Sequence, residues 1–258
     1  MRALLLRMRQ GVGTVDYPSG PAIMPEGFRG APAVDRSRCA DGCSDCANAC
    51  PTVAIELTHN GAAIDLGKCL FCTDCVEACA TGAITHSTDH RMAARRREDL
   101  VVQEKVKLAD ALDKKARRLF GRSLSLRQVS AGGCNGCEAE INTLNSILFD
   151  LSRFGVHLAA SPRHADGLII TGPVTQNMVG ALEKAYDAIP TPKIVIAVGA
   201  CAISGGIFAD HPQQSNGADR VVPVDLYIPG CPPHPVTILD GLLHLLGRIE
   251  NEKDSGVH

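Results

Sequence analysis

Two runs of four cysteines in the first third of the chain constrain its fold more than any other feature. The first run comprises Cys39, Cys43, Cys46 and Cys50, and the second comprises Cys69, Cys72, Cys75 and Cys79. From the third cysteine onward the two copies are offset by 29 residues, and both continue into Thr-x-Ala-Ile. Each copy therefore supplies three closely spaced thiols and a fourth thiol on the following turn.

This spacing predicts two iron–sulfur clusters that exchange their fourth ligand. Three thiolates on one tight loop bind three corners of a cubane, whereas the fourth points away and binds the other cluster. The first 4Fe–4S cluster is thus assigned Cys39, Cys43, Cys46 and Cys79, and the second is assigned Cys69, Cys72, Cys75 and Cys50. The runs resemble those of bacterial two-cluster ferredoxins, with one extra residue in the first run and no proline after the second. Two zinc sites are the alternative, but zinc ligands usually come in two pairs.

The remaining four cysteines are spread over the C-terminal half of the chain. Cys134 and Cys137 lie in Gly-Gly-Cys-Asn-Gly-Cys-Glu, Cys201 lies in Gly-Ala-Cys, and Cys231 lies in Gly-Cys-Pro-Pro. Each group follows an expected strand, and ligands gather outside the carboxyl ends of parallel strands. We therefore expect Cys134, Cys137, Cys201 and Cys231 to bind a third 4Fe–4S cluster. A redox Cys-x-x-Cys pair with a buried core thiol at Cys201 is the alternative.

Strands alternate with helices in the second half, which predicts a doubly wound parallel sheet. The expected strands are 123–129, 156–159, 167–171, 193–198 and 221–228, and the expected helices are 138–151, 177–188 and 235–247. Aromatic residues make up only 3% of the chain, as suits buried parallel strands of aliphatic residues. The expected fold is an α+β ferredoxin-like two-cluster domain followed by an α/β flavodoxin-like domain with a parallel sheet.

The expected boundaries divide the chain into five segments. They are an irregular N-terminal extension (1–38), the ferredoxin-like domain (39–88), a charged helical linker (89–122), the α/β domain (123–250) and a tail (251–258). Residues 1–10 have the composition of a short basic amphipathic helix. Such a helix lies on a membrane surface or docks to a partner. An ordinary docked or frayed terminus is the alternative.

Charge and hydropathy limit the function. A formal net charge of −2 argues against non-specific nucleic-acid binding. No segment approaches the roughly 20 apolar residues that cross a bilayer, and no secretory signal is expected. We therefore expect a cytoplasmic protein with reduced thiols, in which clustered cysteines indicate metal or redox chemistry.

Other polar residues lie near the third group of cysteines. Glu138 directly follows Cys137, and two interpretations of it remain open. It is either a proton relay beside the cluster or a carboxylate that complements the N-terminus of the next helix. His211 and His234 are not expected to be ligands, because four cysteines already suffice.

Four motifs of the C-terminal half resemble a known family. They are Gly-Gly-Cys-Asn-Gly-Cys-Glu (132–138), Thr-Gly-Pro-Val-Thr-x-Asn-Met (171–178), Val-Gly-Ala-Cys-Ala-x-Ser-Gly-Gly-Ile-Phe (198–208) and Tyr-Ile-Pro-Gly-Cys-Pro-Pro (227–233). They resemble the small subunit of energy-converting, membrane-bound nickel–iron hydrogenases, including formate hydrogenlyase, which is similar to the complex I subunit with the terminal cluster. Residues 13–18 and 27–30, with the two cysteine runs, resemble the two-cluster ferredoxin subunit of the same complexes. Two normally separate subunits thus look fused.

The resemblance implies an electron-transfer subunit of a membrane-associated nickel–iron hydrogenase complex. Electrons would pass through three 4Fe–4S clusters to or from a large catalytic subunit, and this chain would hold no catalytic residue of its own. Further implied partners are other peripheral-arm subunits, antiporter-like or quinone-module-like membrane subunits, and a protein that donates or accepts electrons. The chain would be cytoplasmic and peripheral to the membrane.

Two alternatives to the hydrogenase interpretation remain open. Complex I typically has two adjacent cysteines where this chain has Cys134-x-x-Cys137, and this difference favours the hydrogenase side. The first alternative is a complex I-like or hydrogenase-related oxidoreductase that lacks the nickel–iron site. The second is a stand-alone polyferredoxin without a catalytic partner.

Overall fold

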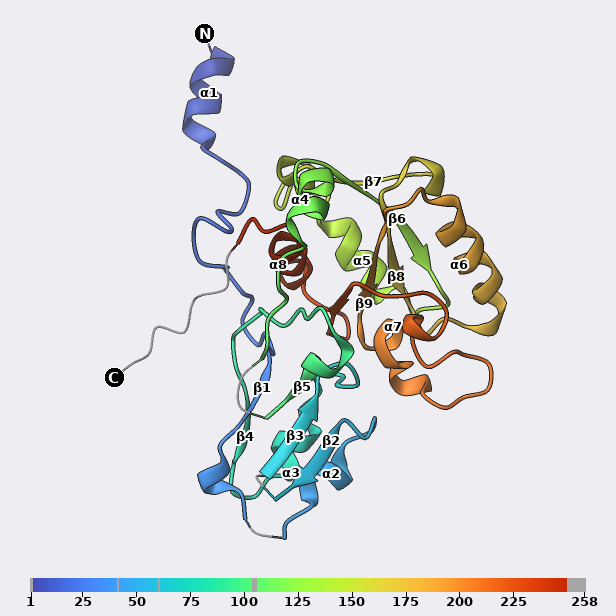
Figure 1. The fold of residues 1–258 in the computed structure, drawn as a ribbon. Coiled ribbons are helices and arrows are strands. Elements are labelled where there is room, and N and C mark those ends of the chain that lie inside the picture. Colours follow the sequence, from blue (N-terminus) through green and yellow to red (C-terminus); the bar gives the residue numbers. More distant parts are fainter. Residues whose placement is uncertain (1, 41, 60, 104–105, 250–258) are drawn as a thin grey trace.

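The computed structural model describes residues 2–40, 42–59, 61–103 and 106–249 (Figure 1), and the predicted tail 251–258 lies outside them. The helices are α1 (Arg2–Gln10), α2 (Asp45–Ala49), α3 (Asp74–Ala78), α4 (Lys114–Phe120), α5 (Gly136–Thr143), α6 (Gln176–Ala188), α7 (Ala200–Ser204) and α8 (Pro235–Leu245). The strands are β1 (Pro32–Val34), β2 (Ile55–Thr58), β3 (Gly61–Asp65), β4 (Ile84–His86), β5 (Val101–Val102), β6 (Leu124–Ser130), β7 (Val156–Leu158), β8 (Gly167–Thr171), β9 (Ile194–Val198) and β10 (Leu226–Ile228). None of the described helices is long and apolar enough to cross a membrane.

The C-terminal half is built on a five-stranded parallel sheet with the strand order β10-β9-β8-β6-β7. Counted along the chain from β6, this is the 2-1-3-4-5 order of flavodoxin-like sheets. Every residue of β8 and β9 is buried, as expected of central parallel strands that are covered on both faces. The predicted parallel α/β sheet is confirmed.

Successive residues of β8 enter two different hydrophobic cores. Leu168 and Ile170 pack toward α6 and α7, whereas Ile169 packs toward α5 and α8. Neighbouring side chains of a strand point to opposite faces, so the two helix pairs cover opposite faces of the sheet (Figure 1).

The cysteine-rich part is built from short antiparallel pairs. β1 pairs with β4, and β2, β3 and β5 form a second small sheet. The apolar side chains of the cysteine-rich part belong to the same buried cluster as Leu168 and Ile170 of the parallel sheet. They include Ile55, Ile64, Leu66, Phe71 and Ile84. The two parts of the chain therefore share one hydrophobic core.

Most described residues of 89–122, predicted to be a charged helical linker, have no regular secondary structure. Among the described residues of this segment, only α4 and the 3-10 turn η2 (Arg97–Leu100) are helical. β5 pairs with β3, and Ala94 exchanges two backbone hydrogen bonds with Tyr227 of β10. The segment is irregular because its apolar residues and backbone contact both parts of the protein. Met92 and Leu100, for example, are buried.

Two elements of the parallel-sheet half are shorter than predicted. α5 ends at Thr143 rather than near residue 151, and the chain then turns through Asp150, whose φ is 45°. β10 begins at Leu226 rather than at residue 221, because Pro223 has no N–H to donate to a sheet.

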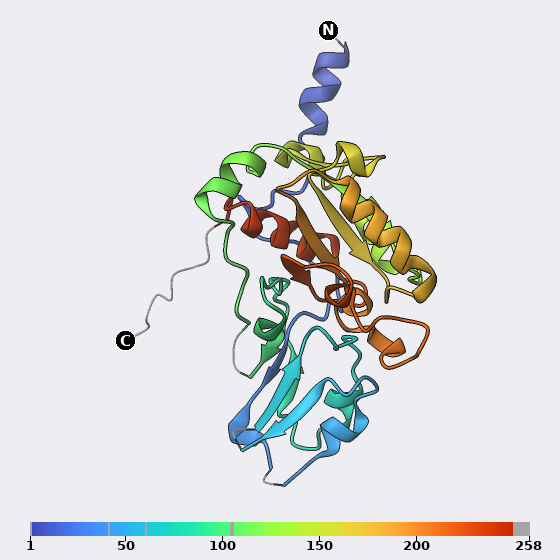
Figure 2. The ribbon, with the colours of Figure 1, turned by 45° about the vertical axis from the view of Figure 1, so that its right-hand side comes forward.

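The N-terminal extension begins with the predicted helix, α1, which stands away from the body in Figures 1 and 2. The following segment runs along the parallel-sheet half before it reaches β1. It is held there by Arg153 Nη2, which donates to the carbonyl oxygens of Val15 (2.6 Å) and Tyr17 (2.9 Å).

A close contact joins the cysteine-rich part to α7. Ser204 Oγ donates to the Gly67 carbonyl at 2.8 Å, and a Cβ on Gly67 would lie only 2.7 Å from Ile203 Cγ2. Beside it, Arg97 binds Asp65 bidentately, with N–O distances of 2.8 and 2.6 Å. The Arg97–Asp65 ion pair and the bare backbone at Gly67 therefore position the loop that carries Cys69 against α7, which carries Cys201.

Replacing Arg97 tests the contact between the cysteine-rich part and α7. Arg97→Met is expected to lower the free energy of unfolding by about 2 kcal/mol, because two charge-assisted hydrogen bonds are lost and a mostly buried Asp65 loses its cation. Arg96→Met is the matched control, since Arg96 is mostly exposed and lies 4.0 Å from Glu98. Its effect is expected to stay within about 0.5 kcal/mol. Equal urea-unfolding midpoints for the two variants would contradict the role given to Arg97.

Candidate metal centres

The last four cysteines converge at the carboxyl edge of the parallel sheet. Cys134 lies between β6 and α5, Cys137 lies in the first turn of α5, Cys201 lies in α7 after β9, and Cys231 follows β10. Burial raises the pKa of Cys137, and the nearby Cys201, Glu138, Cys231 and Cys134 raise it further. Burial likewise raises the pKa of Cys201 to about 11, with contributions from Cys231 and Cys134. The structure therefore brings together the four thiols that the sequence predicted.

Two glycines make room for these sulfur atoms. A Cβ on Gly199 would lie 2.5 Å from Cys137 Sγ, and a Cβ on Gly206 would lie 2.8 Å from Cys201 Sγ. Their φ angles of +90° and +57° are in the left-handed region, which glycine adopts without strain. These two glycines let the backbone approach the thiols as closely as a bound inorganic group requires.

Glu138 is held beside the thiols by two hydroxyl groups. Ser130 Oγ donates to Glu138 Oε1 at 2.5 Å, and Thr171 Oγ1 donates to the same oxygen at 2.7 Å. Burial by itself raises the pKa of Glu138, but these hydrogen bonds outweigh it, so the pKa lies below its ordinary value. Glu138 is thus an ionised carboxylate that is buried next to Cys137, with only 6% of its surface exposed. Its role as a proton relay stays a prediction.

The first eight cysteines form two sets of four. Each set consists of three cysteines from one run and one cysteine from the other run. Burial raises the pKa of Cys46, and Cys79, Cys39 and Cys43 raise it further. A cavity of about 200 Å³ is lined by these same four cysteines. Cys79 of the second run is therefore placed beside the three thiols of the first run.

The second set has the reciprocal arrangement. Burial raises the pKa of Cys69 to about 12, and Cys75, Cys50 and Cys72 add to the effect. All four line one narrow cavity. Cys50 of the first run is therefore placed beside the three thiols of the second run, as the spacing predicted.

The Thr-x-Ala-Ile tails bind the sulfur atom of each exchanged cysteine in the same way. The N–H of Ala54 donates to Cys50 Sγ and that of Ala83 donates to Cys79 Sγ, both at 3.2 Å. The Thr81 hydroxyl lies 3.5 Å from Cys79 Sγ and lowers the pKa of that thiol. The repeated Thr-x-Ala-Ile tails are visible in the sequence, but their hydrogen bonds to the cysteine sulfurs are not. Their identical offset from the exchanged cysteine in both copies is the one feature that could have predicted this role.

The turn between the exchanged cysteine and its alanine needs a left-handed residue. Gly82 supplies it in the second copy with φ +61°, and Val53 has φ 50° in the first copy. A β-branched residue is rare in this region and carries strain. Val53 is also 74% exposed, so its side chain does not compensate by packing.

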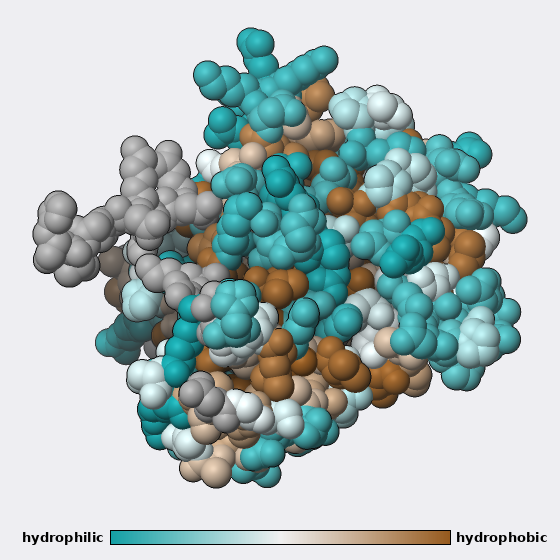
Figure 3. Space-filling view, turned by 60° about the horizontal axis from the view of Figure 1, so that its bottom comes forward, coloured by the Kyte–Doolittle hydropathy of each residue, from teal (hydrophilic) through white to brown (hydrophobic). Residues whose placement is uncertain are grey.

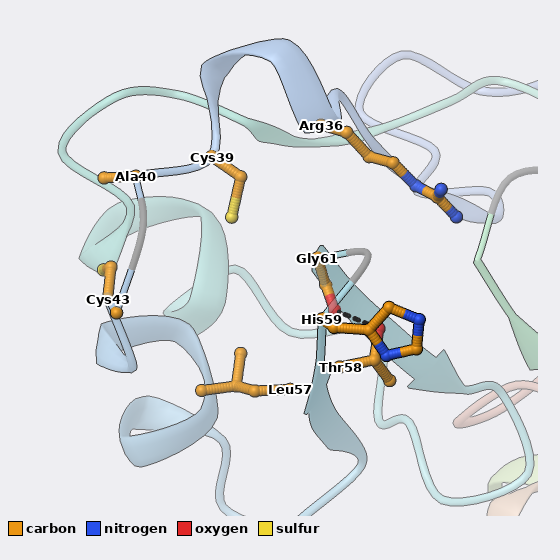
Figure 4. Close-up of a pocket in the computed structure, with 9 residues that line it drawn as sticks. Arg36, Cys39, Ala40, Cys43, Leu57, Thr58, His59 and Gly61 are labelled. Carbon is orange, nitrogen blue, oxygen red and sulfur yellow. Dashed lines mark hydrogen bonds between the residues drawn. The ribbon is translucent and has the colours of Figure 1, made fainter.

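A surface pocket of about 390 Å³ opens next to the first set (Figure 4). Cys39 and Cys43 come from the loop with the extra residue, and the β2–β3 turn with His59 lies opposite. Thr58 Oγ1 holds this turn by donating to the Gly61 carbonyl at 2.8 Å. In Figure 4 the sulfur of Cys39 points into the space between the two loops. Cys39 and Cys43 of the first set are therefore half-buried beside a surface pocket, whereas Cys46 is buried.

The second thiol set lies near both of the others. Cys46 of the first set contributes to the raised pKa of Cys75 in the second set, after burial and the closer thiols Cys72 and Cys50. Cys72 of the second set contributes to the raised pKa of Cys231 in the third set, after burial and Cys134. Because such effects fall with distance, the second set lies between the first and the third.

The two histidines near the third set have other partners. His211 Nδ1 accepts from the N–H of Gln213, and His234 Nδ1 accepts from that of Val236 at the start of α8, both at 3.2 Å. Across the described ranges, no three His, Cys, Asp or Glu side chains are placed to hold a single metal ion.

Two family profiles match consecutive parts of the chain. A 4Fe-4S dicluster domain matches residues 31–80, and the family described as "NADH ubiquinone oxidoreductase, 20 Kd subunit" matches residues 134–245. With the thiol sets and the parallel sheet, these matches define an iron–sulfur protein of oxidoreductase complexes. The resemblance read from the sequence is thereby confirmed.

Individual relatives agree with this class. The probable membrane-bound hydrogenase subunit mbhJ of Pyrococcus furiosus is 44% identical over 132 residues, which cover 51% of this chain and 79% of the relative. Formate hydrogenlyase subunit 7 of Escherichia coli is 50% identical over 131 residues, 51% of each chain. An NADH-quinone oxidoreductase subunit of Heliobacterium modesticaldum is 42% identical over 140 residues, 54% of this chain and 79% of the relative. The chain belongs to the family of the NADH ubiquinone oxidoreductase 20 Kd subunit.

The lowered pKa of Glu138 predicts a pH-dependent contribution to stability. A carboxylate with a lowered folded-state pKa stabilises the fold above its unfolded pKa, and this is lost as the pH falls through the folded value. Glu138→Gln is therefore expected to cost about 1 kcal/mol at pH 7, measured by urea unfolding. The difference from wild type should shrink below about pH 4.5, the ordinary pKa of the group.

Glu140→Gln is the matched control for Glu138. Burial raises the pKa of Glu140, which reverses the sign, because the fold prefers the neutral side chain. This variant is expected to be at least as stable as wild type at pH 7. The same loss of stability in both variants would show that the hydroxyl groups around Glu138 are not the cause.

Proposed function

We propose that this chain is an electron-transfer subunit that relays electrons through three 4Fe–4S clusters to or from a large catalytic subunit. The observation that carries the proposal is the position of the second thiol set between the other two. The cluster ligands would be Cys39, Cys43, Cys46 and Cys79 in the first set, Cys69, Cys72, Cys75 and Cys50 in the second, and Cys134, Cys137, Cys201 and Cys231 in the third.

The residues around each set fit an iron–sulfur cluster. The first two sets each line a cavity, and burial with the repulsion between thiolates raises the pKa of several thiols in all three sets. Such thiols become thiolates when a metal binds, with release of protons. When bound, the clusters supply one-electron transfer. The chain contributes backbone N–H groups toward sulfur, as at Ala54 and Ala83, and bare backbone at Gly199 and Gly206.

The third set is the end of the proposed path that a partner would face. Cys134 and Cys231 are exposed, and so are Ile207 (62%) and Phe208 (45%), which follow Cys201. Figure 3 shows apolar side chains at the surface in the middle of the face that it presents. Exposed apolar side chains around a redox site suit a large protein partner better than water. This observation disfavours the stand-alone polyferredoxin.

The proposed complex is a membrane-associated nickel–iron hydrogenase of the formate hydrogenlyase kind. Hydrogenase and formate hydrogenlyase subunits are among the relatives, and the Cys134-x-x-Cys137 spacing favours that side. The chain would be cytoplasmic and peripheral to the membrane, with other peripheral-arm subunits, membrane subunits and an electron donor or acceptor as partners. A complex I-like complex without nickel is the second candidate, favoured by the similarity to a subunit of NADH-quinone oxidoreductase.

Gly199→Ala tests the third cluster. A methyl group there would overlap Cys137 Sγ, so the variant is expected to keep about eight irons per chain where wild type holds about twelve. Gly180→Ala in α6 is the control, because a Cβ at that position would meet nothing within 4 Å. Iron and acid-labile sulfide analysis gives the numbers. Zinc in place of iron, or about eight irons already in wild type, would contradict three clusters.

The complete complex tests the choice of partner. Purified with its native partners and a low-potential reductant, it is expected to evolve hydrogen, and its large subunit is expected to contain two Cys-x-x-Cys pairs. Cys137→Ser should abolish hydrogen evolution while the clusters of the first two sets remain reducible. Quinone reduction without hydrogen evolution, and a large subunit without those pairs, would instead establish the complex I-like candidate.

A further inference from the structure

One hydroxyl group lies between the backbone segments that carry ligands of the second and third thiol sets. Ser204 Oγ donates to the Gly67 carbonyl oxygen at 2.8 Å and lies 3.1 Å from the Ala200 carbonyl oxygen. The carbonyl carbon of Ala200 is bonded to the nitrogen of Cys201, and a single residue separates Gly67 from Cys69. The Ser204 hydroxyl therefore completes a continuous line of covalent bonds and short polar contacts from Cys69 to Cys201.

A second cysteine of the second set joins the same line of contacts. Thr52 Oγ1 donates to the Lys68 carbonyl oxygen at 2.8 Å and lies 3.8 Å from Cys50 Sγ. Lys68 is the residue that separates Gly67 from Cys69, so its two peptide groups belong to the line already described. Both Cys50 and Cys69 therefore reach the Gly67 carbonyl through the backbone around Lys68.

The peptide group of Gly67 is held from both sides. Its N–H donates to Asp65 Oδ1 at 2.9 Å, and Asp65 is bound in turn by Arg97. A Cβ on Gly67 would lie 2.7 Å from Ile203 Cγ2, so the absence of a side chain is what brings the Gly67 carbonyl within hydrogen-bond distance of α7. Gly67, Ala200 and Ile203 are all buried. The contact is therefore shielded from solvent and keeps one geometry.

Two routes lead from the second set to the third, and the Ser204 hydroxyl belongs to one of them. Carbonyl groups only accept hydrogen bonds, so the Gly67 and Ala200 oxygens cannot bond to each other without a donor between them. Electrons tunnel more readily along covalent and hydrogen bonds than across an empty gap of the same length. The rival route runs directly between the sulfur atoms of Cys72 and Cys231, which lie near each other because Cys72 contributes to the raised pKa of Cys231.

We propose that the Ser204 hydroxyl is the bridge through which electrons pass between the second and third clusters. The proposal rests on the proposed function, because it assumes a cluster at each of these two sets. In each transfer one cluster is oxidised by one electron and the other is reduced by one electron, while no bond breaks and the hydroxyl group keeps its proton. Ser204 is a positioning residue, which acts through the Gly67 and Ala200 carbonyl groups and not as a cluster ligand.

Electron injection into the full complex tests the bridge. A light pulse on a photosensitiser injects one electron, and electron paramagnetic resonance of rapidly frozen samples follows its passage from the second cluster to the third. Ser204→Ala is expected to slow this passage severalfold, whereas Ser204→Thr, which retains a hydroxyl group, is expected to stay close to wild type. Thr143→Val is the matched control and should not slow the passage. Thr143 Oγ1 also donates to the carbonyl four residues earlier in its own helix, at 2.9 Å to Ala139, but it is exposed on α5.

The magnetic dipolar splitting between the two reduced clusters measures their separation independently. It is expected to be the same in wild type and Ser204→Ala, which distinguishes loss of the bridge from a movement of the loops. An unchanged rate in Ser204→Ala would show that electrons pass directly between Cys72 and Cys231, and it overturns the proposal. A slower rate with a smaller splitting also overturns it, because Ser204 would then only hold the loops together. Absence of the second or third signal in wild type refutes the proposed function instead.

Discussion

The approach of the Gly67 backbone to α7 sets the distance between the second and third thiol sets. Gly67 precedes Cys69 by two residues, and the Ile203 and Ser204 side chains that meet it follow Cys201 closely. Any side chain at position 67 would push apart the two loops that carry these cysteines. Electron transfer slows steeply with distance, so this contact would matter for the proposed path from the second thiol set to the third. The Arg97–Asp65 ion pair stiffens the same contact from the side.

The rest of the fold supports that contact from both directions. The cysteine-rich part and the α6–α7 side of the parallel sheet share one buried cluster, so neither part can move without exposing apolar surface. The segment between them adds backbone pairing to each part, through β5 on one side and Ala94 on the other. A chain that joins two electron-transfer modules thereby also fixes their relative placement, which a flexible linker would leave open.

Local patterns in the sequence are enough to predict the thiol sets and the sheet. Cysteine spacing is a local property, and the exchange of Cys50 and Cys79 follows from the geometry of a tight loop. The strands β8 and β9 are continuous aliphatic runs, and such runs are typical of parallel strands that are buried on both faces. The linker is less helical than predicted, with α4 and η2 as its helical parts, because a few apolar positions among its charged residues are buried against partners elsewhere in the chain. Gly67 and Ser204 are 137 residues apart, and nothing local marks either one as the other's partner.

Charge differs between the two ends of the proposed path. Arg36 lines the pocket beside Cys39, and Arg38 donates to the Thr81 carbonyl near Cys79. At the other end, the ionised Glu138 raises the pKa values of Cys137 and Cys201. Negative charge close to a cluster disfavours the added electron, whereas positive charge favours it. We therefore expect the third cluster to be harder to reduce than its ligands alone would make it. An electron that reaches it is then readily passed to a partner.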